Sequence, residues 1–277
     1  DIGSIDVNPA NGELYLKEMN RQQIHVYSLD GKFKHSFTFP EGKRMSRMCL
    51  FSPDYLIAEQ ESKVPDDQDA NFYPYLLVST RDGHLDSLDY VQKRNILVKL
   101  IVNAENHSYA YLLEPSLIRN GSRFYIGNPD SDTLFAMNPD RTLEPLLVRT
   151  PSHSEEGNKY GLFLRGAAGA YFFLTKQPME VPMNSIESLD LKSEEWLYDC
   201  RTQEVCRYLL KNKDDASKRV EGIMFFCYPE DCGLAVLKSE DLMDAYEAGQ
   251  LSGELKEIAA GLKADDNPVL MLIHFKK

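Results

Sequence analysis

Short apolar stretches separated by turn residues dominate the chain from end to end. Their length and their alternation of apolar and polar positions predict β-strands rather than helices. Many strands come in pairs joined by a tight turn, as at Asn11-Gly12 and Asn120-Gly121, where Asn and Gly accept the positive φ that such turns require. These first hairpins are predicted at residues 4–19, 49–60, 116–127, 161–175 and 222–238.

A second kind of hairpin alternates with the first. It is predicted at residues 23–39, 75–90, 132–148 and 195–210. Its turns recur every 50–60 residues or so, which predicts one four-stranded antiparallel sheet per repeat. Small sheets at this period are typical of a β-propeller, whose blades bury their faces against one another. A β-sandwich is the alternative, but it gives no reason for a fixed order of turns.

The predicted propeller occupies residues 1–277 as a single domain. Its five visible units run approximately over residues 1–40, 41–103, 104–150, 151–211 and 212–277. The last unit departs from the pattern, because Leu242, Tyr246 and Leu255 recur at helical intervals within residues 239–262. The predicted fold class is therefore an all-β propeller of four-stranded antiparallel blades, with two short helices inserted before a closing strand in residues 265–277.

Two segments carry a resemblance to a known family. IHVYSLDGKFKHSF at 24–37 and the ending ADDNPVLMLIHFKK at 264–277 resemble the six-bladed β-propeller proteins of Bacteroides-type bacteria, many of them exported lipoproteins. The resemblance implies export, a periplasmic or cell-surface location and a lipid anchor upstream of Asp1. Family members usually carry one more N-terminal blade, so either a sixth blade precedes Asp1 or this propeller closes with five.

The net charge of the chain limits the classes of partner that it can bind. The sequence has 31 basic and 43 acidic residues, a formal net charge of −12, which argues against broad nucleic-acid binding and against attraction to anionic lipid. Apolar runs such as residues 269–273 are far shorter than the ~20 residues of a membrane-spanning helix. We therefore expect neither a nucleic-acid partner nor a transmembrane segment.

Four of the five cysteines lie in pairs on opposite arms of predicted hairpins. Cys200 would face Cys206 across a three-residue turn, and Cys227 would face Cys232 across a four-residue turn. Two interpretations stay open, namely cross-strand disulfides in an oxidising compartment and buried free thiols. Zinc is not expected, because neither pair has the C-x-x-C spacing and no histidine lies close by in the sequence.

Catalytic motifs are not found in the sequence. There is no G-x-S-x-G, H-E-x-x-H, Walker or G-x-G-x-x-G motif, and the six histidines are scattered. Asp66, Asp67 and Asp69 in the acidic segment 61–71 could bind calcium, although a solvated acidic loop is the simpler interpretation. We expect no catalytic residue, no metal site and no cofactor.

A ligand site is predicted from the geometry of the propeller. Links between blades converge around the central channel, where pockets form. The predicted links are residues 40–48, 104–111, 151–160 and 212–220. The candidate ligand-binding residues in or beside these links carry a positive charge, an imidazole or an aromatic ring, and they are Arg44, Arg47, His107, Tyr109, Tyr111, His153, Tyr160 and Arg219.

The sequence therefore favours a non-enzymatic, exported binding or scaffold propeller. Its ligand at the central funnel would be a glycan, an anionic small molecule or a peptide. A domain devoted to protein–protein contact is not distinguished from this by sequence. The alternative is a metal-dependent hydrolase or lyase of the lactonase-like propeller type, with calcium on the axis, and it rests on analogy of fold alone.

Overall fold

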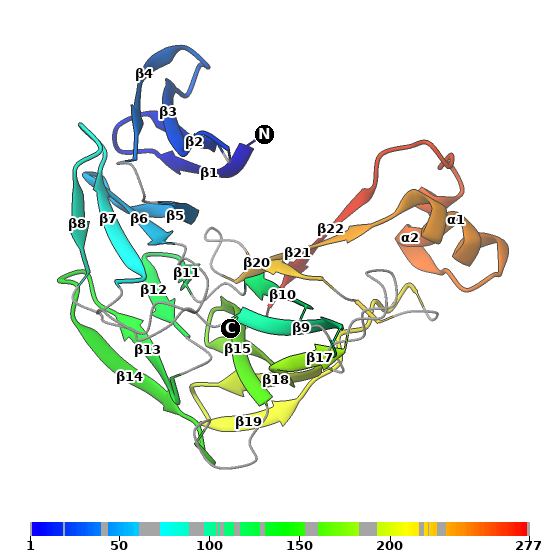
Figure 1. Cartoon of the computed structure of the whole chain (residues 1–277). Helices are drawn as coiled ribbons and strands as arrows, with labels where there is room; N and C mark the ends of the chain where they lie inside the picture. The colour runs from blue at the N-terminus through cyan, green and yellow to red at the C-terminus, as the bar shows by residue number, and fades with distance from the viewer. Residues whose placement is uncertain are drawn as a thin grey trace. The chain divides into compact units, whose positions relative to one another are not determined.

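The computed structural model of the chain describes residues 2–18, 20–39, 44–60, 73–88, 97–103, 105, 108–113, 117–127, 131–152, 160–182, 193–215, 219–220, 222–225 and 231–275. These residues form two compact units, drawn together in Figure 1. The first unit comprises residues 1–96 and 138–143, and the second comprises residues 97–137 and 144–277.

The first unit contains two four-stranded antiparallel sheets whose strands follow chain order. One consists of β1 (Ile2–Asn8), β2 (Glu13–Glu18), β3 (Gln23–Ser28) and β4 (Phe33–Thr38). The other consists of β5 (Met45–Ser52), β6 (Tyr55–Gln60), β7 (Tyr75–Ser79) and β8 (Leu85–Ser87). Apolar residues from both sheets, including Tyr15, Ile24 and Leu56, are fully buried in one core. In β3, β6 and β7, alternate residues face this core, as the period of two predicts.

The second unit contains two further sheets of the same type. One consists of β11 (Leu117–Asn120), β12 (Arg123–Ile126), β13 (Thr133–Met137) and β14 (Leu143–Val148). The other consists of β15 (Tyr160–Ala168), β16 (Tyr171–Pro178), β18 (Glu194–Asp199) and β19 (Glu204–Arg207). They share a core in which the rings of Tyr125 and Phe172 pack edge to face, with centroids 4.8 Å apart. The two sheets therefore pack through their apolar faces as neighbouring blades do.

One sheet of the second unit was not predicted. β9 (Leu97–Asn103) pairs antiparallel with β10 (Ser108–Leu113), and β17 (Glu180–Pro182) adds to β9 in parallel. The segment 104–111 was predicted as a link between blades, and this is wrong for residues 108–111, which lie in a strand. The physical reason is that strand pairing with β9 satisfies the backbone groups that a link would leave to solvent.

The C-terminal sheet consists of β20 (Met224–Phe225), β21 (Cys232–Leu237) and β22 (Val269–His274). Helices α1 (Ser239–Glu247) and α2 (Gly253–Ala259) lie between β21 and β22 in the chain and are drawn in orange in Figure 1. They pack on each other through buried apolar residues, among them Leu242 and Leu255. The predicted pair of short helices and the closing strand are therefore confirmed.

The predicted fold class is confirmed. The chain is all-β, with four four-stranded antiparallel sheets of the propeller-blade type and two three-stranded sheets among the described residues. Only two short helices interrupt the strands in that part of the chain. The number of blades and the single domain stay predictions. Neither described helix is long and apolar enough to cross a membrane.

Candidate functional site

The predicted ligand-binding residues are distributed over both compact units. Arg44 and Arg47 belong to the first unit, where Arg44 is exposed just before β5 and Arg47 is exposed within it. In the second unit, Arg219 forms an isolated antiparallel bridge with Lys211. His107, His153 and the acidic segment 61–71 lie outside the described residues.

Both tyrosines of the predicted link 104–111 belong to strand β10. The backbone of Tyr109 pairs with Ile101, and that of Tyr111 pairs with Lys99. The expected place of these two residues in a loop is therefore wrong, while their role in ligand binding stays a prediction.

Tyr160 is a predicted ligand-binding residue whose neighbours include two positively charged side chains. It begins β15, and its main-chain carbonyl accepts a hydrogen bond from Nη2 of Arg149 at 2.9 Å. Tyr160 pairs with Pro178 across β15 and β16, so Lys176 is its diagonal neighbour on the same face. The Lys176 ammonium lies 4.8 Å from the centroid of the Tyr160 ring. We call Arg149, Tyr160 and Lys176 the Tyr160 cluster.

Arg149 connects the Tyr160 cluster to a small pocket. The pocket is lined by Gly127, Ser131, Asp132, Thr133, Leu134, Leu147, Arg149, Leu162, Leu164 and Leu174. Burial lowers the pKa of the Arg149 guanidinium, and the nearby Asp132 carboxylate opposes this shift. The Asp132 carboxylate also accepts a hydrogen bond from the Ser152 hydroxyl. Nη1 of Arg149 is buried without a hydrogen-bond partner among the described residues, a costly state for a charged donor.

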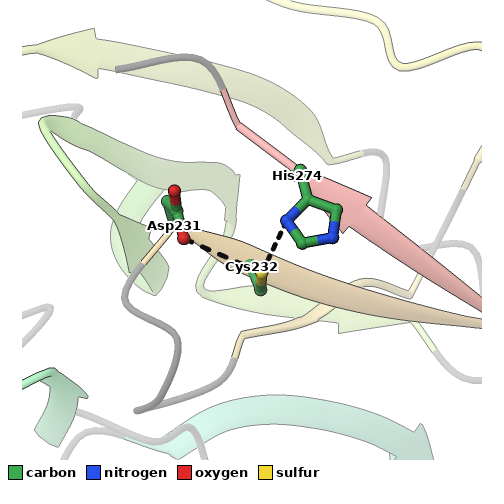
Figure 2. A group of neighbouring side chains, drawn as sticks. All are labelled: Asp231, Cys232 and His274. Carbon is green, nitrogen blue, oxygen red and sulfur yellow. Dashed lines mark hydrogen bonds between the residues drawn. The ribbon is translucent and has the colours of Figure 1, made fainter.

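A second cluster lies at the start of β21, as Figure 2 shows. Sγ of Cys232 is 3.1 Å from Nδ1 of His274 and 3.8 Å from Oδ1 of Asp231. Cys232 and His274 are direct partners in the pairing of β21 with β22. The carbonyl of Asp231 accepts a hydrogen bond from the Phe275 amide at 2.8 Å, which holds Asp231 beside that pair. We call Asp231, Cys232 and His274 the Cys232 cluster.

The electrostatics of the Cys232 cluster oppose a nucleophilic thiolate. Cys232 is fully buried, and burial together with the Asp231 carboxylate raises the pKa of its thiol. A catalytic cysteine needs the reverse, namely a lowered pKa and a carboxylate that orients the histidine. Here the carboxylate faces the thiol, so the arrangement suits three ligands around one point better than a nucleophile and its base.

Of the two interpretations left open for Cys200 and Cys206, the structure has the free thiols. The pairing of β18 with β19 sets Cys206 opposite Leu197, so the turn is longer than the three residues expected. Cys200 packs with the core side of the sheet, whereas Cys206 is exposed on strand β19. Their side chains therefore belong to opposite faces of the sheet.

The possible disulfide between Cys227 and Cys232 stays a prediction. Cys232 is a free thiol, and Cys227 lies outside the described residues. The argument against zinc, that no histidine lies near these cysteines, fails for Cys232, since His274 is its cross-strand neighbour. The contact between Cys232 and His274 could have been predicted by pairing the second strand of the hairpin predicted at 222–238 with the predicted closing strand.

Comparison with known proteins gives similarity of fold. Neither the protein-family models nor the curated sequences match the chain. A solved structure of a predicted exported protein from Bacteroides fragilis matches with a TM-score of 0.66 at 13% identity, over 100% of this chain and 77% of that protein. The two share a fold. The chain also matches a DUF4221 member from Bacteroides vulgatus (TM-score 0.49, 8% identity, 95% of this chain and 76% of that one).

A third solved structure, BamB from Moraxella catarrhalis, matches with a TM-score of 0.42 at 9% identity, over 84% of this chain and 60% of that protein. The Bacteroides fragilis structure alone supports the resemblance to Bacteroides-type proteins, at the level of fold. The number of six blades, the lipid anchor and the family itself stay predictions.

Proposed function

We propose that this chain is an exported, non-enzymatic binding propeller that recognises a ligand carrying a carboxylate, such as an acidic glycan. Two observations support it. The fold is shared with a predicted exported protein, and the Tyr160 cluster presents an aromatic ring and two cations at a sheet edge. A periplasmic or cell-surface location, anchored by lipid, is part of this proposal.

The main support for the proposal comes from the environment of Arg149. Its guanidinium is partly buried beside the pocket, and one of its two terminal nitrogens has no acceptor among the described residues. A planar guanidinium binds a carboxylate through two parallel hydrogen bonds. Nη1 is inaccessible to solvent in this structure, so a ligand carboxylate would satisfy it after the guanidinium turns outward and would then offset the cost of burying the charge.

Tyr160 and Lys176 complete the chemistry expected of such a site. Tyr160 is 44% exposed as a residue, and its aromatic side chain could stack on the ring of a sugar. Lys176 adds a mobile positive charge beside that ring, so an anionic sugar would meet charge and stacking surface together. Arg44 and Arg47, which are exposed in the first unit, stay predicted ligand-binding residues apart from this cluster.

The test is a binding screen against acidic and neutral glycans, followed by titration calorimetry on every glycan that binds. We expect a uronic-acid glycan to bind, and Tyr160→Ala combined with Lys176→Ala to weaken that binding about tenfold or more. The matched control is Arg207→Ala, because Arg207 lies 5.3 Å from the Trp196 ring in an equivalent exposed cation–π pair. Equal losses in both variants, or binding of neutral glycans alone, would contradict the proposal.

A further inference from the structure

We infer that Asp231, Cys232 and His274 form a binding site for a divalent transition-metal ion of the zinc type. The site is separate from the Tyr160 cluster and does not rest on the glycan-binding proposal. It offers one sulfur, one imidazole nitrogen and one carboxylate oxygen. Thiolate and imidazole ligands select zinc-type ions over calcium and magnesium, which prefer oxygen ligands alone.

The distances fit a single ion. The three ligand atoms all lie within 4.8 Å of one another, with Sγ to Nδ1 at 3.1 Å and Sγ to Oδ1 at 3.8 Å. Tetrahedral zinc, with bonds of about 2.0–2.3 Å, keeps neighbouring ligand atoms about 3.3–3.8 Å apart. One ion can therefore contact all three atoms once the side chains shift by up to about an ångström.

The backbone holds the three ligands in place. Cys232 and His274 stand opposite each other in the β21–β22 pair, and the hydrogen bond from the Phe275 amide to the Asp231 carbonyl closes the end of that pair. Figure 2 shows the side chains of all three residues converging. Because strand pairing fixes the ligands before the ion arrives, little conformational entropy is lost on binding.

Charge balance explains why this combination suits a cation. Without an ion, Sγ of Cys232 lies within contact distance of both Nδ1 of His274 and Oδ1 of Asp231. A divalent ion replaces the thiol proton, which leaves to solvent, and the thiolate and the carboxylate then neutralise its two positive charges. Cys232 is buried but His274 is exposed, so the fourth position of the ion would be open to water or to an outside ligand.

The test uses the untagged full chain, stripped of metal and kept under a mild phosphine reductant. Titration with Co²⁺ should produce a thiolate-to-cobalt charge-transfer band, and Zn²⁺ should displace the cobalt with loss of the band. Cys232→Ser should abolish the band and weaken zinc binding at least about 100-fold, because a direct ligand counts for more than a supporting contact. His274→Gln should weaken zinc binding comparably.

The matched control is Cys206→Ser, since Cys206 is an exposed free thiol on a neighbouring hairpin. This variant should keep both the band and the zinc affinity. Circular dichroism reports whether Cys232→Ser folds, and His274→Gln alters an exposed side chain, so it tests the site even if Cys232→Ser does not fold. A band that survives both ligand substitutions, or one lost in Cys206→Ser, would overturn the inference. A disulfide between Cys227 and Cys232 in the oxidised native protein would also overturn it.

Discussion

The two cysteine-bearing hairpins of the second unit behave in opposite ways. Cys200 and Cys206 are near neighbours in the sequence, yet they lie on opposite faces of the sheet that contains β18 and β19. Cys232 and His274 are far apart in the sequence, yet they are direct partners across β21 and β22. The comparison teaches that strand register decides which side chains meet, because a shift of one residue moves a side chain to the other face.

The largest expected effect comes from the core face on which Cys200 packs. Phe172 is 2% exposed and contacts Tyr125 and Tyr198, so Phe172→Ala should lower the free energy of unfolding by about 3–5 kcal/mol. Cys206→Ala, at an exposed position on the other face of the same sheet, should cost under about 1 kcal/mol. Chemical denaturation measures both, and similar costs would mean that the two faces are not distinct.

A smaller loss is expected from crowding the Cys232 cluster. A β-carbon at Gly233 would lie 2.9 Å from Cγ2 of Ile223 and 3.3 Å from Cε2 of Phe275. Gly233→Val should therefore lower the free energy of unfolding by about 1–3 kcal/mol and separate Cys232 from His274. Gly261→Ala is the control, because its β-carbon would meet only ordinary contact. Unchanged stability in Gly233→Val would show that Ile223 and Phe275 do not pack tightly on Gly233.

A still smaller change in the free energy of unfolding is expected on raising the pH, and it should depend on Cys232 but not on Cys206. Burial and the Asp231 carboxylate raise the pKa of Cys232 in the folded state. Above about pH 8.5 the unfolded thiol loses its proton while the folded thiol keeps it, so stability should fall as the pH rises through that value. Cys232→Ser should remove this part of the alkaline loss, and Cys206→Ser should not. Denaturation at pH 7.5 and pH 9.5 or so makes the comparison.

The rates at which Cys206 and Cys232 react with a thiol reagent should also differ. Cys206 is exposed and should react first, whereas the buried Cys232 should react last. Mass spectrometry of the labelled peptides identifies each site. A fast reaction at Cys232 would contradict its burial.

The smallest effect is expected at the turn between β18 and β19. Arg201 donates hydrogen bonds to both carboxylate oxygens of Asp199, and this lowers the pKa of Asp199 to about 2. Because the folded-state pKa is lowered, the contribution is present above about pH 4 and is lost as the pH falls towards 2. Arg201→Ala should return the pKa of Asp199 towards its ordinary value of 3.8, measured by NMR titration. An unchanged pKa would show that the ion pair is not formed in solution.

Much of the fold could be predicted from alternation and turn chemistry alone. Asn11-Gly12 and Asp30-Gly31 lie in turns where Gly12 and Gly31 adopt positive φ, and the hairpins around them form where expected. The helices near the C-terminus follow from the spacing of Leu242 and Leu255. Interactions between residues close in the sequence determine these turns and helices, so they can be predicted from the sequence.

Long-range pairing was beyond such arguments. The parallel contact between β17 and β9 joins segments that no local pattern connects, and Pro182 within β17 weakens its strand signal. The Cys232 cluster was missed for the same reason, because His274 reaches Cys232 only through strand register. Of the predicted ligand-binding residues, Tyr160 lies in a developed polar cluster, and the others gain no further support from the described residues.

The parallel pairing of β17 with β9 also bears on the order in which the chain can fold. The polypeptide is synthesised from its N-terminus, so β9 and β10 can form a hairpin early. The other edge of β9 has no partner until Glu180–Pro182 has been synthesised. Contacts between such distant segments slow folding, and an unpaired strand edge invites association with other chains. A nascent chain halted before residue 180 is therefore the species that we expect to aggregate first.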